Sequence, residues 1–345
     1  MAQDTEHGGA VSRRNFIASG AGVTGLAALG ASAAETKKEE AALPPLGPRD
    51  TATITMVQLT AGEGIPPVLD RMPAFFRQAA DLGSDLVVFP EYVLGHNLTP
   101  KSEAAQRFFA LAREHRINAV TGCVEAHGDK WATSAWVVDR QGTLVGRYLK
   151  SHPASGPAPH FWPPVGDSAA EAQGVLGSEF KVFTLDFGPV GILQCYDGYF
   201  PEAWGCTSYL GAEIILWING RDGMVEDAYC ITAANCYGCV VGANITMGFN
   251  TGFAGPGCVA PVGGPGDPPE QMRLWPRVKQ PGDAAVTAVI NLAELRWKRK
   301  HLRTMHQRRP EMYGLLTRDV TMWKDYPDIP WDRPECAALV NKAQL

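Results

Sequence analysis

The sequence predicts an α/β domain built from layers of strands and helices. Short apolar or alternating segments, typical of strands, recur between segments whose apolar residues repeat every three to four positions, typical of helices. This alternation is the pattern of folds in which helices cover the faces of a sheet. The 345 residues, 45% of them hydrophobic and 19% charged, are sufficient for a sizeable core within one large domain.

The expected elements begin near Thr51 and follow one another closely. The expected strands are 53–59, 85–89, 119–124, 134–138, 144–148, 180–186, 190–194, 213–218 and 284–291. The expected helices are 67–82, 102–115 and 202–210. Two segments rich in glycine and proline interrupt the pattern. We expect 150–177 to be a long loop that lines a pocket, and 248–269 to be a second loop.

The first 33 residues have the pattern of a cleavable export signal. Residues 12–17 have the sequence Ser-Arg-Arg-Asn-Phe-Ile, a twin-arginine pattern, and a weakly apolar run over 16–30 precedes the small residues Ala-Ser-Ala at 31–33. The run is too short for a stable membrane span. We therefore expect folding in the cytosol, followed by export to the periplasm or beyond through the twin-arginine pathway.

Three further parts are expected behind the signal. A charged and then proline-rich linker spans 34–50, the main domain spans 51–318, and a C-terminal extension without clear periodicity spans 319–345. A domain that folds in the cytosol starts with reduced thiols, so the eight cysteines are expected to be mostly free and buried.

Charge and motifs exclude several classes of partner. The formal net charge is -5, and the basic cluster at 296–309 is too local to bind a nucleic-acid backbone. The sequence contains no Walker phosphate loop and no His-Glu-x-x-His zinc motif, so we expect neither a cofactor nor a metal. The spacing of Cys236 and Cys239 leaves a thiol-metal or redox site as an alternative, although no second cysteine pair accompanies it.

Three reactive side chains stand just beyond the ends of expected strands. They are Glu91, Lys150 and Cys195. In layered α/β folds, strand ends open onto the crevice where ligands bind, so three such residues can meet in one site. Taken singly, each also has an ordinary structural explanation, as a buried thiol or as a solvated charge.

Together, the three side chains suit acyl transfer from a carbon-nitrogen bond. A thiol with an unperturbed pKa of about 8.5 is only a few per cent thiolate at neutral pH, so Cys195 would gain from Glu91 as a general base. Lys150 would stabilise the oxyanion that forms on the substrate. The backbone N–H of Tyr196 would be a second donor to this oxyanion, and one such donor typically contributes about 3 kcal/mol.

Several motifs surround these residues. They are Val-Phe-Pro-Glu at 88–91, Gly-Arg-Tyr-Leu-Lys at 146–150, Gly-Ile-Leu-Gln-Cys-Tyr-Asp at 191–197, Phe-Pro-Glu at 200–202, and later segments at 240–244, 286–291 and 308–313. On these motifs, the chain resembles the nitrilase superfamily of carbon-nitrogen hydrolases over residues 51–316. The first three motifs occur in the family's order.

The resemblance implies a single domain folded as a four-layer α-β-β-α sandwich. It implies a catalytic triad of Glu91, Lys150 and Cys195 that works without a metal, in which the glutamate is the base for acylation and for the hydrolytic water. It also implies a second glutamate in the loop after the lysine, for which Glu171 is the candidate and Glu179 the alternative. A homodimer or a larger homo-oligomer is implied as well.

Departures from the family pattern bear on the substrate. Tyr196 and Asp197 after the nucleophile resemble the amidase and carbamoylase branches, whereas nitrile-cleaving members carry Trp-Glu there. Tyr199 stands where many relatives have an arginine that would suit carboxylate recognition, so N-carbamoyl amino acids are less favoured. The candidates for substrate binding, besides the backbone of Tyr196, are Tyr199, Trp162, Trp217 and Asn219.

These observations lead to one main hypothesis. The chain is expected to be an exported thiol hydrolase that cleaves a non-peptide C–N bond of a small amide or ureido compound through a thioester on Cys195. The products would be an acid and ammonia or an amine. Two alternatives are a nitrilase that acts on a nitrile and a catalytically silent binding protein with the same fold.

Overall fold

The computed structural model divides the chain into two units, residues 1–42 and residues 43–345. The residues that it describes all belong to the second unit, and they are 49–60, 64–154, 171, 173–262 and 269–317. The expected export signal, nearly all of the expected linker and the C-terminal extension lie outside the described residues.

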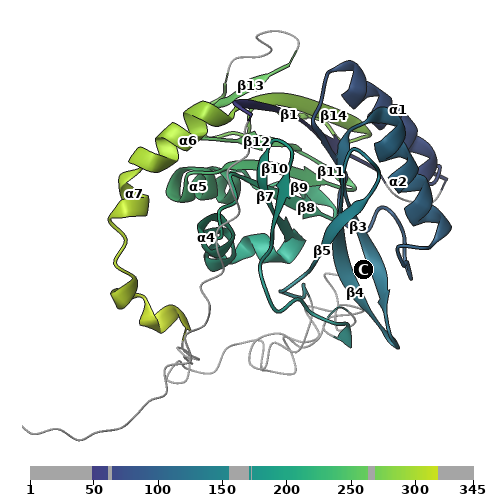
Figure 1. Cartoon of the computed structure of the whole chain (residues 1–345), viewed down its shortest axis with the longest axis horizontal. Helices are drawn as coiled ribbons and strands as arrows, with labels where there is room; N and C mark the ends of the chain where they lie inside the picture. The colour runs from purple at the N-terminus through teal and green to yellow at the C-terminus, as the bar shows by residue number, and fades with distance from the viewer. Residues whose placement is uncertain (1–48, 61–63, 155–170, 172, 263–268, 318–345) are drawn as a thin grey trace, which may run out of the picture. The chain divides into compact units, whose positions relative to one another are not determined.

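Seven strands form the larger of two main sheets (Figure 1). In spatial order they are β13 (Val259–Pro261), β14 (Ala284–Asn291), β1 (Thr51–Gln58), β2 (Leu86–Val88), β3 (Asn118–His127), β4 (Lys130–Val138) and β5 (Leu144–Leu149). The central strands β1, β2 and β3 run parallel, and the remaining neighbours are antiparallel. Parallel strands end at the same edge of a sheet, so the residues after β2 stand at that edge.

Five strands form the second main sheet. In spatial order they are β12 (Gly252–Ala254), β10 (Val240–Ile245), β8 (Ile214–Asn219), β7 (Gly188–Gln194) and β6 (Val182–Leu185). The three central strands are parallel and the two outer strands are antiparallel to them. A separate two-stranded sheet pairs β9 (Gly223–Met224) with β11 (Gly248–Phe249).

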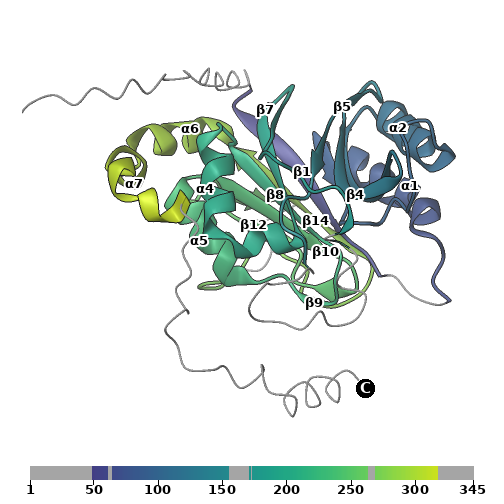
Figure 2. The same ribbon diagram turned by 90° about the horizontal axis from the view of Figure 1, so that it is seen from below.

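The described domain has four layers, which two views show from different sides (Figure 1, Figure 2). Helices α1 (Val68–Asp81) and α2 (Glu103–His115) cover the outer face of the seven-stranded sheet. Helices α4 (Pro201–Tyr209) and α5 (Asp227–Tyr237) cover the outer face of the five-stranded sheet. The two sheets face each other between these helices. The α-β-β-α sandwich implied by the sequence motifs is therefore confirmed.

Apolar side chains fill each of the three spaces between the layers. In β1, Met56 belongs to the core between the two sheets, and its neighbour Val57 belongs to the core under α1 and α2. In β8, Leu216 faces the other sheet, and Trp217 faces α4 and α5. Successive side chains of a strand point to opposite faces, so strands that are buried on both faces need nearly continuous apolar sequences.

Helix α6 (Leu292–His301) packs against the end of the five-stranded layer. It is followed by α7 (Arg303–His306) and by two short 3-10 segments with no buried residues, η3 (Pro310–Met312) and η4 (Gly314–Thr317). Arg299 of α6 donates hydrogen bonds to the backbone oxygens of Ser208, Ala212 and Gly238 at 3.1, 2.9 and 2.9 Å. These oxygens lie at the C-terminal ends of α4 and α5, where helical carbonyls lack partners of their own.

Each strand and helix that the sequence predicts overlaps an observed element of the same type, but one expectation is wrong. The segment 248–269 is predicted as a loop, yet it contains β11, β12 and β13. Strands of two or three residues are too short for an alternating pattern to be visible. The periodicity also fails to predict α6, because charged residues dominate that helix.

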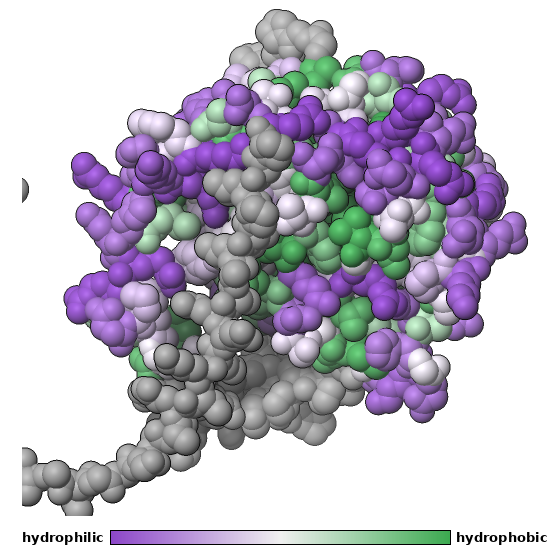
Figure 3. Space-filling model, in the orientation of Figure 1, coloured by the Kyte–Doolittle hydropathy of each residue, from purple (hydrophilic) through white to green (hydrophobic). Residues whose placement is uncertain are grey.

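Much of the surface that Figure 3 shows is hydrophilic, and the described cysteines are free thiols. Hydrophilic side chains cover much of the face in Figure 3, and hydrophobic ones gather near its middle. No helix in the described part of the chain is long and apolar enough to cross a membrane. The seven cysteines within the described ranges are free, and those that are buried are Cys123, Cys195, Cys230, Cys239 and Cys258. Cys206 and Cys236 are exposed.

Candidate active site

The structure brings the three strand-end residues together in the interior. Glu91 follows β2, Lys150 follows β5 and Cys195 follows β7, so two come from the larger sheet and one from the smaller. All three are buried. The Nζ atom of Lys150 lies 3.1 Å from Oε1 of Glu91. The charges of both residues act on the thiol of Cys195.

Cys195 occupies a sharp turn between a strand and a helix. It directly follows β7 and is the first residue of the 3-10 helix η2 (Cys195–Tyr199). Its φ of 42° lies in the left-handed region that non-glycine residues rarely adopt. A hydrogen bond from Nε1 of Trp217 to the backbone oxygen of Cys195, at 2.7 Å, helps to fix this conformation. Such local strain persists only where the surroundings hold it, and it is common at functional sites.

Asp197 connects the turn at Cys195 to the chain around Lys150. Its buried carboxylate accepts hydrogen bonds from the backbone N–H of Gln194 at 3.0 Å and from the hydroxyl of Tyr148 at 2.8 Å. The other carboxylate oxygen accepts from the backbone N–H of His152 at 2.9 Å and lies 2.8 Å from Nδ1 of the same residue. Residues next to Cys195 and on both sides of Lys150 thus bind the same carboxylate.

The carboxyl group of Glu91 is placed to exchange protons. Its Oε2 accepts a hydrogen bond from the backbone N–H of Gly220 at 2.9 Å. Its buried Oε1 contacts Lys150 but has no aligned hydrogen-bond partner among the described residues. Burial raises the pKa of Glu91 to about 7; Lys150 opposes this rise and Glu171 adds to it. A carboxyl group with a pKa near the working pH can serve as both general base and general acid.

Lys150 is a buried cation between two carboxylates. Its Nζ lies 2.7 Å from Oε1 of Glu171 as well as 3.1 Å from Glu91. Burial alone would lower the pKa of Lys150, but the negative charge of Glu91 and of its neighbours outweighs burial and raises this pKa well above the usual value. The lysine therefore keeps a positive charge at the position where an oxyanion could form.

The structure places Glu171, and not Glu179, beside the lysine. Oε1 of Glu171 also accepts hydrogen bonds from the hydroxyls of Tyr92, at 2.6 Å, and Thr133, at 3.0 Å. Burial would raise the pKa of Glu171, but Lys150, the hydroxyl of Tyr92 and the backbone N–H of Ala154 lower it, so the group is ionised. Glu179 is exposed and pairs with Lys181 instead.

The thiol of Cys195 is protonated in the resting site. Burial and then the negative charge of Glu91 raise its pKa to about 12, and Lys150 only partly offsets them. An attack by the sulfur therefore needs a base that removes the proton as the new bond forms. Glu91 is a carboxylate within the same buried cluster, and its Oε1 is available to accept that proton.

A comparison with protein families identifies the class to which this arrangement belongs. A family model described as carbon-nitrogen hydrolase matches residues 53–234. The chain belongs to the carbon-nitrogen hydrolase family. The match contains Glu91, Lys150, Glu171 and Cys195, so all four charged or nucleophilic groups of the candidate site lie within the family's segment.

Similar proteins carry several activities in their names. A nitrilase of Pyrococcus abyssi is 31% identical over 152 residues, which cover 40% of this chain and 53% of the relative. An N-carbamoylputrescine amidase of Arabidopsis thaliana is 24% identical over 187 residues, which cover 50% of this chain and 59% of the relative. The chain thus spans little more than half the length of these curated relatives.

Solved structures agree with the fold. A carbon-nitrogen hydrolase from Helicobacter pylori superposes with a TM-score of 0.63 at 16% identity, and the match covers 79% of this chain and 100% of that one. At this identity, the likeness concerns the fold alone. The nitrilase-type sandwich of this hydrolase family member is therefore supported both by its own layers and by a known structure.

The expected substrate-binding residues of this carbon-nitrogen hydrolase have different environments. Tyr196 and Tyr199 are partly exposed beside Cys195, and the hydroxyl of Tyr199 donates to Glu226 at 2.7 Å. Trp217 is fully buried and donates its indole N–H to the backbone oxygen of Cys195. Asn219 is also fully buried; its amide donates to the backbone oxygens of two strands, β8 and β10. Trp162 lies outside the described residues.

Three groups in the site have no clear signal in the sequence. Tyr92 directly follows Glu91, but nothing in the spacing indicates that its hydroxyl binds Glu171. Asp197 lies within the nucleophile motif, although only the structure shows its four contacts. Gly220 acts through its backbone N–H, which no pattern of side chains can reveal.

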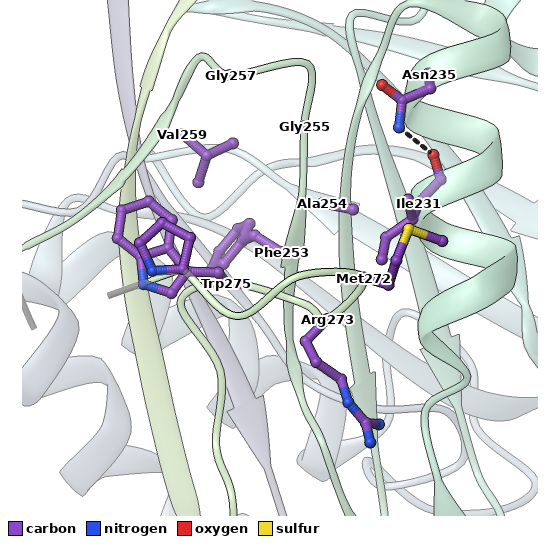
Figure 4. Close-up of a pocket in the computed structure, with 11 residues that line it drawn as sticks. Ile231, Asn235, Phe253, Ala254, Gly255, Gly257, Val259, Met272, Arg273 and Trp275 are labelled. Carbon is purple, nitrogen blue, oxygen red and sulfur yellow. Dashed lines mark hydrogen bonds between the residues drawn. The ribbon is translucent and has the colours of Figure 1, made fainter. Parts of the chain in front are cut away.

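A separate cavity of about 270 Å³ lies beside α5 (Figure 4). Ile231 and Asn235 of the helix face it from one side, and Phe253, Val259 and Trp275 face it from the other. None of the candidate catalytic residues lines this cavity, so it is distinct from the site around Cys195.

The raised pKa of Glu91 predicts that the stability of Glu91→Gln relative to the wild type increases with pH. The folded state binds the proton of Glu91 more tightly than the unfolded state, because the pKa is about 7 when folded against a reference value of 4.5. The stability from the protonated group is complete below about pH 4.5 and is lost as the pH rises through 7. Glutamine avoids this loss, which is on the order of 3 kcal/mol.

We therefore expect the melting temperature of Glu91→Gln, taken relative to that of the wild type in thermal unfolding, to be higher at pH 8 than at pH 4. Glu179→Gln is the matched control, because that glutamate is exposed. A margin that does not change with pH would contradict the proposed environment of Glu91.

Proposed function

We propose that this protein hydrolyses the C–N bond of a small amide or ureido compound through a thioester on Cys195. The observation that carries the proposal is the buried contact of Lys150 with two carboxylates that act on the thiol of Cys195. Oε1 of one of them, Glu91, has no aligned hydrogen-bond partner among the described residues. This arrangement combines a nucleophile, a base and a cation for the oxyanion in one water-poor space.

In the first step, the sulfur of Cys195 attacks the carbonyl carbon while Glu91 accepts the thiol proton. The carbonyl oxygen becomes negatively charged, and Lys150 and the backbone N–H of Tyr196 are the proposed donors to it. A cation that is already in place needs no reorganisation as this charge forms. Glu171 keeps Lys150 oriented and charged through its 2.7 Å contact.

In the second step, the tetrahedral adduct collapses and the C–N bond breaks. Glu91 returns its proton to the leaving nitrogen, so ammonia or an amine departs and a thioester remains on Cys195. A water molecule then attacks the thioester, and Glu91 accepts a proton from it. The second collapse breaks the C–S bond, returns the proton to the sulfur and releases the acid. Carbamic acid from a ureido substrate would decompose further to carbon dioxide and the second nitrogen product, which is an amine if ammonia left first and ammonia if the amine left first.

An amide or ureido substrate is favoured over a nitrile. Tyr196 and Asp197 after the nucleophile resemble the amidase and carbamoylase branches, and one similar protein is an N-carbamoylputrescine amidase. A nitrilase remains the second candidate, because the relative at 31% identity carries that name. The two reactions differ chemically. Addition of the thiol to a nitrile forms a covalent adduct without expelling a group, whereas the adduct with an amide expels ammonia or an amine to form the thioester.

The proposal predicts that ammonia release from small amides or ureido compounds depends on Cys195. We expect Cys195→Ala to lower turnover by at least 10³-fold, because the nucleophile is removed. Ammonia is measured from matched amides, ureido compounds and nitriles. The control is Cys206→Ala, which removes an exposed cysteine and should keep wild-type rates. Turnover of nitriles alone would replace the amidase proposal by the nitrilase one, and unchanged turnover in Cys195→Ala would refute both.

Export is a second part of the proposal, and its support comes from the N-terminal sequence alone. The twin-arginine pattern at 12–17 and the small residues at 31–33 predict cleavage after Ala33. We expect the exported protein to begin at Ala34 by mass spectrometry of the periplasmic fraction. The double variant Arg13→Lys, Arg14→Lys should stay uncleaved in the cytosol. Equal export of this variant would count against the twin-arginine pathway.

We also propose that the chain forms a homodimer or larger homo-oligomer through its C-terminal arm, defined as residues 310–317. The arm exposes three apolar side chains, Met312, Leu315 and Leu316, at 61%, 65% and 63% of their surfaces. An exposed cluster of large apolar residues is typical of a protein interface. A second copy of the chain is the proposed partner, in line with the family resemblance.

The double variant Leu315→Glu, Leu316→Glu should shift this oligomer toward the monomer, because burying two carboxylates in an apolar interface is costly. Sedimentation velocity measures the masses of the wild type and the variant. Thr317→Glu adds a charge to the same arm at a polar position and should keep the wild-type mass. A monomeric wild type would refute the oligomer.

A further inference from the structure

Arg221 stands beside the candidate site but is not part of the triad. It follows Gly220, whose backbone N–H donates to Glu91 at 2.9 Å. Its guanidinium lies over the ring of Tyr199, 5.9 Å from the centroid. Tyr199 is the last residue of the 3-10 helix that Cys195 begins. Arg221 therefore adjoins two residues of the site. Gly220 binds the proposed base, Glu91, and Tyr199 belongs to the 3-10 helix of the proposed nucleophile, Cys195.

Glu226 holds this arginine in place. Nη2 of Arg221 lies 2.5 Å from Oε2 of Glu226, and the other oxygen of that carboxylate accepts the hydroxyl of Tyr199 at 2.7 Å. Nη1 of Arg221 also contacts the backbone oxygens of Asp222 and Met224, at 3.4 and 3.3 Å. Arginine, tyrosine and glutamate thus form one hydrogen-bonded cluster, and only 24% of the arginine side chain is exposed.

This cluster packs against the support of the nucleophile. The ring of Tyr199 contacts the ring of Trp217, with 6.1 Å between the centroids. Trp217 donates its indole N–H to the backbone oxygen of Cys195. Every link from Arg221 to Cys195 is therefore a direct contact of partly or fully buried residues, and the last link ends on the backbone of Cys195.

The charges around the thiol come from four elements. Glu91 after β2 and Glu171 in the loop beyond Lys150 disfavour an anionic sulfur, whereas Lys150 after β5 and Arg221 after β8 favour it. Lys150 contacts both of these carboxylates, whereas Arg221 contacts one carboxylate, that of Glu226, so the charge of Arg221 is compensated less than that of Lys150. A second cation would then matter for a sulfur whose pKa is otherwise raised by burial and by Glu91.

We propose that Arg221 is a second cation that serves the nucleophile, and that Glu226 is the positioning residue that holds it there. This inference rests on the proposed function, because it assigns a task to Arg221 within the same reaction. Arg221 would stabilise the sulfur as it gains negative charge, whereas Lys150 would serve the oxyanion of the substrate. Arg221 acts through its charge and is not placed in contact with the reacting atoms.

The test compares Arg221→Lys with Arg221→Gln, a pair of similar size that differs in charge. Each variant is treated with iodoacetamide, a neutral reagent that loses iodide as the thiolate forms a C–S bond. The extent of reaction at Cys195 is read by mass spectrometry of its peptide, because the exposed Cys206 and Cys236 react with the reagent too. Rates are measured from pH 6 to 11, where the fraction of thiolate rises with pH.

We expect Arg221→Gln to alkylate Cys195 about 10-fold more slowly than Arg221→Lys at pH 8, with its profile moved by about one pH unit to higher pH. Arg273→Gln is the matched control, because that arginine pairs with Asp227 and has no effect on the thiol comparable to that of Arg221. It should follow the wild-type profile. Equal profiles for the lysine and glutamine variants would overturn the inference.

The alkylation does not require amide hydrolysis, so the two proposals fail separately. A protein that turns over no amide, ureido compound or nitrile can still show the charge-dependent profile, which would leave the proposed function without support and the electrostatic role intact. A protein that hydrolyses amides but shows equal profiles would keep the function and lose the role of Arg221. Circular dichroism confirms that the compared variants are folded.

Discussion

The buried positive charge of Lys150, shared by two carboxylates, is the interaction on which the candidate site depends. Its Nζ lies 3.1 Å from Glu91 and 2.7 Å from Glu171, and almost none of its surface is exposed. Removing one partner of a buried ion pair typically costs about 3–5 kcal/mol. The two carboxylates keep the lysine charged. The lysine in turn keeps the pKa of Glu91 lower than burial and Glu171 alone would make it.

The fold brings these charges together because the ends of strands from both sheets meet. Glu91 follows a strand of the larger sheet, yet its carboxylate is held by Gly220 at the end of the smaller sheet's β8. Asn244 of β10 donates to the backbone oxygen of Val88 at 3.0 Å, which fixes the end of β2 across the interface. A Cβ atom at Gly122 would stand 2.4 Å from Cα of Glu91, so this close approach requires glycine.

The sequence predicts the parts of the site that depend on strands and fails for parts that depend on loops and backbone groups. The sequence predicts Glu91, Lys150 and Cys195 because continuous apolar runs mark their strands, and because strand ends open onto clefts. Glu171 enters only through a family resemblance, since no periodicity places a residue within a long loop. The N–H of Gly220 leaves no trace in the sequence, and neither do the two- and three-residue strands of the segment 248–269.

The environment of Tyr199 shows why a single position cannot be interpreted alone. The family resemblance leads to the expectation of an arginine there, so the sequence indicates a loss of positive charge. The structure instead places the guanidinium of Arg221, from the end of β8, over the ring of this tyrosine. Glu226 pairs with that guanidinium, so the cluster as a whole is neutral. A cation with a fixed partner can act on a nearby sulfur without drawing a carboxylate substrate into the pocket. This combination is consistent with the proposed preference for an uncharged amide or ureido group over an N-carbamoyl amino acid.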